Sequence, residues 1–422
     1  MNRLRRLATN RLLDVGAVLL IVAILASWSV ILPSRWRNDD FNHYYVGSRM
    51  LLEGQNPYRT SIQAMSTALG FTYNDYLPVA GYPPSFLWLF MPLAALSPRA
   101  AYAIWVSVEI GSLMAILWLT RRLLGDRLSL RGWLFVIALA TISRTVTYHL
   151  YYSQSQLLLA ALVLAGYAAQ RAGRNGWACV AISTAGILKF YPFVLLPWIV
   201  WSGSGGMRAR VYRLLGTIGF VLAIVAVTGP GLWRDFFQYS IPVGVGNEIG
   251  RAFNYLLSGL VTNLGYARYN FNPPPGAKQW WWFMGTMAGL AVIASAYYAC
   301  VATQGDPEMQ FCLLCVAMLI GTVTVQGHYF CFLVFPLTVA TIRVVARPTS
   351  ARVFGLIAVI LAVNYINPPH FLRGRSIWHI FVNDIPLYGV LGLGAYFWLE
   401  LRRPPEFKSI SEPAANPRRA SR

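Results

Sequence analysis

Apolar stretches of membrane length recur along almost the whole chain, and this repetition limits the fold more than any other feature. About 20 apolar residues cross a bilayer as a helix, whereas a membrane β-barrel would show segments of about ten alternating residues. Of the 422 residues, 56% are hydrophobic and only 12% are charged, compared with about 25% charged residues in soluble domains. A soluble globular fold is therefore excluded, and the sequence predicts an all-α polytopic membrane protein.

About twelve crossings can be drawn, which predicts a large transmembrane bundle. The predicted spans are residues 13–32, 100–120, 132–152, 153–171, 175–189, 190–206, 211–230, 280–303, 309–326, 328–346, 351–366 and 377–401. The segment 84–97 is short and contains Pro84 and Pro92, so we interpret it as a re-entrant or interfacial helix buried against protein. Residues 1–403 are then one transmembrane domain, and the Pro-, Ser- and Arg-rich residues 404–422 are a disordered cytoplasmic tail.

The basic residues predict which loops lie inside the cell. The net charge is +20, and 22 of the 35 Lys and Arg fall at ends and loops that alternate to one side of the predicted spans. This is the pattern of the positive-inside rule, so the excess charge indicates orientation rather than binding to nucleic acid. Both termini are then cytoplasmic, and the polar segments 33–83 and 231–279 form two extracytoplasmic loops that can bear short interfacial helices.

The first of these loops opens with two adjacent carboxylates, Asp39 and Asp40. A partly buried carboxylate at the outer mouth of a membrane cavity can take a proton from a hydroxyl group, because burial and a like-charged neighbour both raise its basicity. A solvated loop start or a helix cap is the simpler alternative. The Tyr and Trp residues nearby suit either stacking on sugar rings or an aromatic belt at the membrane surface.

Several polar or cationic residues interrupt the predicted spans near their outer ends. They are Arg144, His149, Gln154, Gln156, Lys189 and His328. Such residues are rare in membranes and often functional, and a phosphate headgroup requires charge-assisted donors in a site of low dielectric constant. The alternative is structural: Lys189 and Arg144 snorkel to the interface, and His328 bonds to a local carbonyl.

Eight short motifs, in order, give the chain a resemblance to glycosyltransferase family 87, a family of integral-membrane enzymes with the GT-C architecture. The motifs are Asp40-Phe41-Asn42-His43-Tyr44-Tyr45, Gly54-Gln55-Asn56-Pro57-Tyr58, Tyr82-Pro83-Pro84, Met91-Pro92-Leu93, Ser153-Gln154-Ser155-Gln156-Leu157, Lys189-Phe190-Tyr191-Pro192, Gly246-Asn247-Glu248 and Gly327-His328-Tyr329. The resemblance spans about residues 38–345. At one position this chain has Ser153 where the family usually has glycine.

The resemblance implies an inverting enzyme that takes a sugar from a polyprenyl-phosphate donor, with mannose favoured, and transfers it to a glycolipid or glycan acceptor at the outer leaflet of a bacterial plasma membrane. It places the catalytic base at Asp40. Donor-phosphate contacts are implied at Lys189 and His328, with Arg144 and Arg251 as further candidates. Candidate substrate-binding residues are Asp39, His43, Tyr44, Tyr58, Tyr82, Gln154 and Asn247.

No cofactor or metal is expected. A monophosphate leaving group surrounded by cations does not need a divalent ion, although the pair Asp39 and Asp40 keeps a metal site open as an alternative. The five cysteines lie in apolar stretches without His or carboxylate neighbours at metal-binding spacing, so they predict neither a disulfide nor a zinc site. A Gly-rich nucleotide motif is not apparent either, which suits a lipid-linked donor.

Two other classes of protein remain as alternatives. A polytopic transporter or a flippase for a lipid-linked or anionic substrate would also need many spans and buried cations, but it usually has repeated halves, which the sequence does not show. A noncatalytic membrane scaffold would give no reason for Asp40, Lys189 and His328 to face one side.

Overall fold

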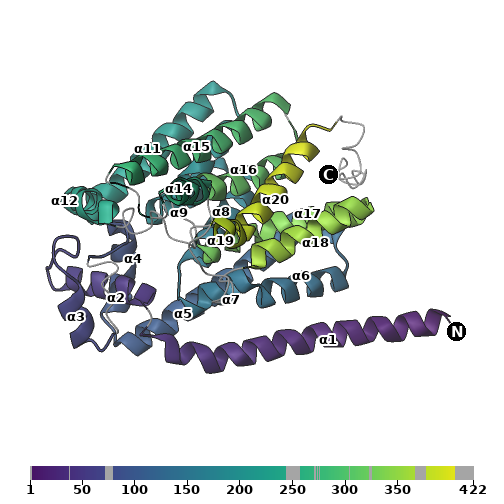
Figure 1. The fold of residues 1–422 in the computed structure, drawn as a ribbon, viewed down its shortest axis with the longest axis horizontal. Coiled ribbons are helices and arrows are strands. Elements are labelled where there is room, and N and C mark those ends of the chain that lie inside the picture. Colours follow the sequence, from purple (N-terminus) through teal and green to yellow (C-terminus); the bar gives the residue numbers. More distant parts are fainter. Residues whose placement is uncertain are drawn as a thin grey trace, which may run out of the picture.

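The computed structural model describes residues 2–37, 39–71, 79–243, 257–269, 272, 274, 276–303, 305–322, 326–365 and 377–403. Every regular element in these ranges is a helix and none is a strand (Figure 1), which confirms the predicted all-helical class. The predicted tail, 404–422, lies outside the described residues.

Helices occupy the N-terminal, middle and C-terminal parts of the described chain. The N-terminal part contains α1 (Asn2–Ile31), η1 (Leu32–Arg35), α2 (Asp39–Leu52), α3 (Gln63–Ala68) and α4 (Pro84–Ala94). The middle part contains α5 (Pro98–Leu124), η2 (Gly125–Arg127), α6 (Leu130–Ile142), α7 (Arg144–Tyr151), α8 (Gln156–Arg171), α9 (Asn175–Leu188), η3 (Tyr191–Leu195), α10 (Leu196–Ser202) and α11 (Met207–Thr228). The C-terminal part contains α12 (Pro230–Asp235), the π-helix η4 (Phe236–Ser240), α14 (Leu257–Ala267), α15 (Ala277–Thr303), α16 (Pro307–Gly321), η5 (Gly327–Leu333), α17 (Val334–Ala346), α18 (Ser350–Asn364), α19 (Ile377–Asn383) and α20 (Ile385–Leu401).

Four helical stretches of the described chain are long and apolar enough to cross a bilayer by themselves: Pro98–Arg127, Met207–Thr228, Ala277–Thr303 and Gly327–Ala346. The pair α6 and α7 makes a fifth if its two halves are one span. Apolar helices of 10–17 residues lie in most of the other predicted spans, among them α9, α16, α18 and α20. The chain is thus a multi-pass membrane protein, and the total of twelve crossings stays a prediction.

Two predicted spans are interrupted rather than straight. The helix expected over 132–152 bends by 44° between α6 and α7, because Ser143 adopts an extended ψ of 127°. The segment 190–206 starts as the 3₁₀ helix η3 and continues as α10. The segment 84–97 forms the 11-residue helix α4, which begins at Pro84, a position where the missing N–H of proline costs nothing.

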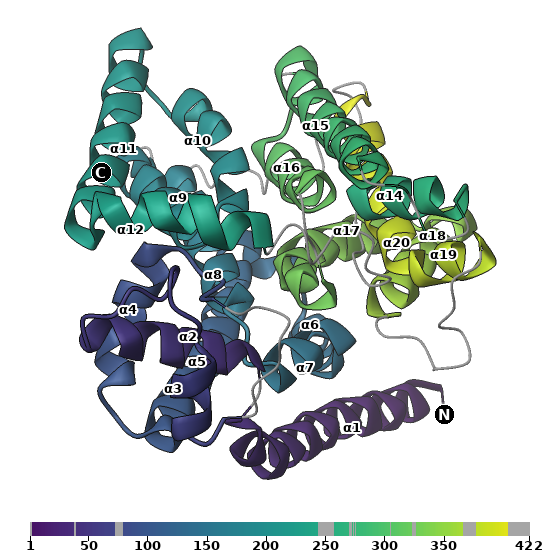
Figure 2. The same cartoon turned by 60° about the vertical axis from the view of Figure 1, so that its left-hand side comes forward.

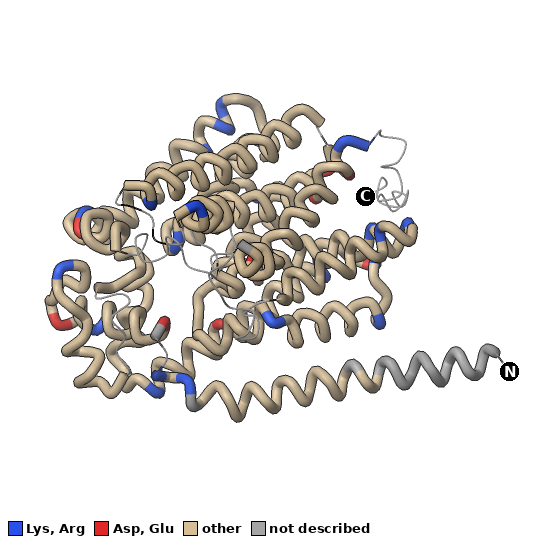
Figure 3. Tube along the Cα trace, viewed as in Figure 1, with Lys and Arg blue, Asp and Glu red and all other residues tan. Residues whose placement is uncertain are grey.

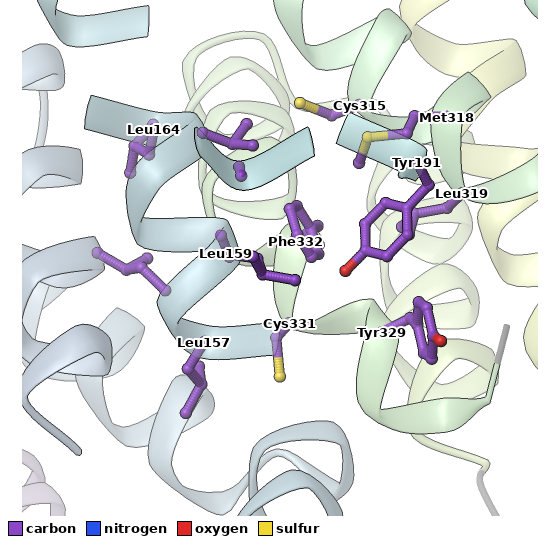
Figure 4. Close-up of a cluster of buried hydrophobic side chains, with 14 of the residues drawn as sticks. Leu157, Leu159, Leu164, Tyr191, Cys315, Met318, Leu319, Tyr329, Cys331 and Phe332 are labelled. Carbon is purple, nitrogen blue, oxygen red and sulfur yellow. The ribbon is translucent and has the colours of Figure 1, made fainter. Parts of the chain in front are cut away.

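The helices pack around one connected cluster of buried hydrophobic side chains. Figure 4 shows part of this cluster, where side chains from α8, η3, α16 and η5 meet and Tyr191 lies beside Tyr329. Helix α1 runs along one edge of the bundle and packs against α6 (Figures 1 and 2). All five cysteines are buried and carry free thiols.

Exposure to lipid differs strongly among the spans. Within its most apolar window, α11 has only 11% of its residues buried, whereas the stretch Gly327–Ala346 has 61% buried. Lys and Arg lie mainly at helix ends and in the connections (Figure 3). This arrangement leaves the middle of most helices apolar, as a bilayer requires.

Candidate functional site

Three side chains from separate parts of the chain form a polar cluster inside the bundle. The hydroxyl oxygens of Tyr44 on α2 and Tyr82 before α4 lie 3.0 Å apart. The Tyr82 hydroxyl donates to Oε1 of Gln154 at 3.3 Å, and Tyr44 reaches the same oxygen at 3.5 Å. All three side chains are buried. The cluster therefore brings together three of the residues that the sequence predicts as substrate-binding.

Lys189 lies directly beside this cluster. Helix α9 ends at Leu188, and Lys189 continues in an extended conformation. Its ammonium nitrogen lies 5.2 Å from the centre of the Tyr82 ring and 4.6 Å from that of the Tyr329 ring. Two aromatic faces attract a cation through their ring quadrupoles. We call Tyr44, Tyr82, Gln154, Lys189 and Tyr329 the aromatic site.

His328 belongs to the same 3₁₀ helix, η5, as Tyr329. It is buried in η5, and its ring centre lies 4.9 Å from that of Tyr329. On another side it stacks against Tyr148 of α7, with 6.2 Å between ring centres and an interplanar angle of 15°. Lys189 and His328, the two predicted phosphate contacts, thus both lie next to the ring of Tyr329.

Asp40 acts electrostatically on both tyrosines of the pair. It is half-buried on α2, four residues before Tyr44, so the two side chains share one helix face. Burial raises the pKa of Tyr44 and of Tyr82 well above the ordinary value, and the negative charge of Asp40 raises both further. A carboxylate and an ammonium group therefore both interact with Tyr82.

Short hydrogen bonds to backbone oxygens hold these elements in register. Ser85 at the start of α4 donates to the carbonyl of Ile187 at 2.6 Å, which ties α4 to the last turn of α9. Tyr58, predicted to bind substrate, is fully buried, and its hydroxyl donates to the carbonyl of Tyr82 at 2.7 Å. In the structure Tyr58 thus positions Tyr82.

His43 is next to Tyr44 on α2 and is also buried. Burial lowers its pKa from 6.5 to about 4, so the imidazole is neutral at neutral pH. Its Nδ1 atom has no hydrogen-bond partner in the described part of the chain.

Of four other predicted residues, the structure places the side chain only of Arg144, which does not join the aromatic site. Arg144 is exposed at the start of α7, where its backbone N–H donates to Asn364 on α18 at 2.9 Å. The side chain of Asp39 and the whole of Asn247 and Arg251 lie outside the described residues.

Reasoning from the sequence missed a buried pair of side chains, Glu109 and His149, which are joined by a hydrogen bond. Oε2 of Glu109 on α5 lies 2.8 Å from Nε2 of His149 on α7, and both side chains are at most 1% exposed. The same carboxylate oxygen accepts the N–H of Leu158 at 3.3 Å. A carboxylate within an apolar span signals such a partner, although the sequence does not show which helix supplies it.

The pair lies next to the turn that presents Gln154. Ser153 has a φ of +54°, a left-handed conformation that glycine adopts more readily. This agrees with the glycine usual at that position in the resembling family. Its carbonyl accepts a hydrogen bond from Trp105 Nε1 at 3.1 Å. Together these contacts fix the turn between α7 and α8.

A second missed feature joins the two predicted extracytoplasmic loops. The guanidinium of Arg59 donates two hydrogen bonds of 2.8 Å to the carboxylate of Asp235, which also accepts from Asn56 at 2.7 Å. These bonds, chiefly that from Arg59, lower the pKa of Asp235. Neither partner stood out in the sequence, because both are ordinary loop residues whose pairing depends on the fold.

Residues suited to a metal ion are not grouped in the described chain, where no cluster of three or more His, Cys, Asp and Glu side chains occurs. Cations and hydroxyl donors dominate the aromatic site instead. Its arrangement suits an anionic group near Lys189 and a hydroxyl near Asp40.

A comparison with protein-family models gives one match. Residues 81–326, more than half of the chain, match the model of glycosyltransferase family 87. The matched range includes Tyr82, Gln154 and Lys189, begins after Asp40 and ends before His328. The curated proteins include no match to this chain.

Proposed function

This chain belongs to glycosyltransferase family 87 and is a membrane glycosyltransferase; from that premise we propose that it moves a sugar, with mannose favoured, from a polyprenyl-phosphate donor to an acceptor hydroxyl at the outer leaflet. One observation carries the proposal: Asp40 and Lys189 both act on Tyr82, since the charge of Asp40 raises the pKa of its phenol and the Lys189 nitrogen lies 5.2 Å from its ring centre. A base and a phosphate-binding cation in one buried site are what a transfer from a phosphate leaving group requires.

The reaction is a single displacement. The acceptor oxygen attacks the anomeric carbon, its proton goes to the Asp40 carboxylate, and the bond from that carbon to the phosphate oxygen breaks. Polyprenyl phosphate leaves with the bonding electrons, and the anomeric configuration inverts. The Lys189 ammonium, held between two rings, stabilises the departing phosphate.

Other residues act on the two substrates. In this proposal His328 also contacts the phosphate, and Arg144 and Arg251 guide it from the lipid side. Gln154 and Tyr44 orient the sugar through hydrogen bonds. Tyr82 stacks on the sugar ring and also forms a hydrogen bond with it. His43, Asp39 and Asn247 complete the predicted substrate-binding set.

The membrane arrangement belongs to the same proposal. Twelve crossings place both termini in the cytoplasm of a bacterium and the aromatic site on the extracytoplasmic side of its plasma membrane. A glycolipid or glycan then serves as acceptor. We propose that no metal takes part, because a monophosphate is a sufficient leaving group when cationic side chains surround it.

The decisive experiment measures transfer of radiolabelled mannose from polyprenyl phosphate in membranes that contain the wild type, Asp40→Asn or Asp126→Asn. Loss of a general base costs about 10²–10⁴-fold in rate, so Asp40→Asn is expected to lose at least a hundredfold. Asp126 is exposed in η2, and its variant should keep wild-type activity. Full transfer by folded Asp40→Asn would overturn the assignment of the base.

Two further readouts separate the proposal from its alternatives. The product should carry the inverted anomeric configuration by NMR, and a chelator should leave the rate unchanged. Lipid-linked sugar that crosses proteoliposome membranes without any new glycosidic bond would favour a flippase instead.

A further inference from the structure

A second anion-binding region lies at the other end of α9. A groove of about 750 Å³ separates the N-terminal half of α9 from α11. We call it the basic groove; among its lining residues are Arg174, Asn175, Trp177, Ser183, Arg213 and Thr217. None of these residues takes part in the aromatic site, which begins where α9 ends.

The charge of this region is wholly positive. Arg174 and Arg213 line the groove, and the sequence contains no Asp or Glu between Asp126 and Asp235. The Arg213 guanidinium is held by the carbonyls of Val200 at 2.9 Å and Ser204 at 2.7 Å. These neutral acceptors fix its position and leave its charge uncompensated.

The groove also contains buried hydroxyl groups. Ser183 is completely buried, Thr217 is 5% exposed, and neither hydroxyl oxygen has a hydrogen-bond partner that meets normal geometry among the described residues. The Cys179 thiol lies beside Thr217. Buried polar groups in proteins are normally satisfied, so the Ser183 hydroxyl points to a ligand that offers an acceptor, and the Thr217 hydroxyl, which is next to the Cys179 thiol, is a second donor in the same groove.

The dimensions of the groove match a phospholipid. Ser183 is eight residues along α9 from Asn175, roughly 12 Å at 1.5 Å per residue, and Thr217 is closer to the arginine end of α11. If the headgroup phosphate binds at the arginines, the glycerol ester carbonyls of the same lipid therefore lie at the level of the Ser183 and Thr217 hydroxyls. Trp177 and Tyr212, 71% and 72% exposed, flank the mouth as aromatic side chains do at a membrane interface.

Access from the bilayer is direct, because α11 is a membrane-spanning candidate with only 11% of its apolar window buried. We propose that the basic groove binds an anionic phospholipid, with its phosphate between Arg174 and Arg213 and its ester carbonyls at Ser183 and Thr217. Basic pockets between membrane helices are suited to anionic headgroups in general.

Two glycines of α11 provide a matched test. Gly216 lines the groove, and Gly219 is one turn further along the same helix. A Cβ atom added at either position meets nothing within 4 Å. Gly216→Leu therefore fills the groove without a clash, whereas Gly219→Leu adds the same side chain elsewhere on α11.

Binding is measured by native mass spectrometry of the detergent-solubilised full chain titrated with phosphatidylglycerol, with phosphatidylcholine or with inorganic phosphate. Wild type and Gly219→Leu should bind phosphatidylglycerol at least about tenfold more tightly than phosphatidylcholine. Gly216→Leu should lose this preference. Arg174→Gln should weaken phosphatidylglycerol binding about fivefold, as expected for one basic residue near an anionic surface, and Arg122→Gln on α5 should not.

Equal binding of the two lipids by the wild type, or equal binding of phosphatidylglycerol by both leucine variants, would overturn the proposal. Displacement of the lipid by inorganic phosphate at millimolar concentration would also overturn it, because the ligand would then be a free anion. Sugar transfer is not part of the readout, so the result is independent of the proposed enzyme activity.

Discussion

The two ends of α9 meet anions in different ways. At the C-terminal end, Lys189 is held between two tyrosine rings, and the phenol groups beside it bond to Gln154. At the N-terminal end, arginines line an open groove in which the buried Ser183 hydroxyl has no hydrogen-bond partner in the described chain. One end presents a cation held between rings, and the other presents arginines around a space.

The difference bears on what each end can do. Fixed charges and dipoles stabilise a transition state because they need not reorganise when charge develops, and only the C-terminal end has a carboxylate nearby, at Asp40. The sequence around the basic groove contains no acidic residue that can act as a base. Under the two proposals, chemistry takes place at the C-terminal end of α9 and lipid binding at its N-terminal end.

The largest expected effect comes from removing the cation of the aromatic site. Lys189→Met keeps an unbranched side chain between the rings but loses the charge, and the transfer rate should fall about 10²–10³-fold, as for other lost electrostatic contacts to a transition state. Lys278→Met, the same change at an exposed lysine of α15, should have no effect. Equal rates in both variants would contradict the assignment of Lys189 as the cation that stabilises the departing phosphate.

The buried pair of Glu109 and His149 should contribute mainly to stability. Glu109→Ala leaves His149 buried without its partner, and such losses cost about 1–3 kcal/mol. Thermal unfolding in detergent should show a clear fall in the melting temperature. Glu109→Gln keeps an acceptor for the His149 N–H and should recover most of the loss; a Gln variant as unstable as the Ala variant would mean that charge, and not the hydrogen bond, is what matters.

A smaller effect is expected from the hydroxyl of Tyr82, which joins Tyr44 to Gln154. Tyr82→Phe keeps the ring beside Lys189 and removes this link. Each of the two lost hydrogen bonds is worth about 1 kcal/mol, so the transfer rate should fall about thirtyfold. Tyr298→Phe, on an exposed part of α15, is the control, and a loss of about a thousandfold in Tyr82→Phe would show that the hydroxyl itself takes part in the reaction.

Much of this architecture was accessible from the sequence because hydropathy reports which segments are helical and apolar. The helices predicted at 100–120, 211–230 and 280–303 are present as long helices. The four-residue spacing of Asp40 and Tyr44 places both on one face of α2. Lys189 stands at the predicted turn after α9.

Hydropathy does not report which faces of the helices meet. The pair of Glu109 and His149 joins residues 40 positions apart on separate helices, and no local pattern specifies that contact. The same reason explains Arg144, which is predicted to contact the donor phosphate but is exposed beside α18. The bend at Ser143 is likewise absent from the apolar pattern, because serine does not interrupt hydropathy as a charge or a proline would.

The smallest predicted effect is a pH dependence of stability that arises from His43 on α2, whereas lipid binding at the basic groove is not expected to depend on pH. Because burial lowers the pKa of His43 to about 4 in the folded protein, below the 6.5 of an unfolded chain, the unfolded state binds more protons in that range. Stability is therefore greatest above pH 6.5 and falls progressively as the pH drops toward 4. Between pH 7 and pH 5.5 the loss amounts to about 1 kcal/mol.

Thermal unfolding of the wild type and His43→Gln over this range isolates the effect, because the variant lacks only this imidazole and its melting temperature should depend less on pH. Lipid binding at the basic groove should stay constant over the same range, since arginine remains charged. Identical pH dependence of unfolding in wild type and variant would show that His43 does not stay neutral in the fold. Lipid binding that changes between pH 7 and pH 5.5 would instead require a titrating group at the N-terminal end of α9, where the groove is lined by arginines, hydroxyls and aromatic rings.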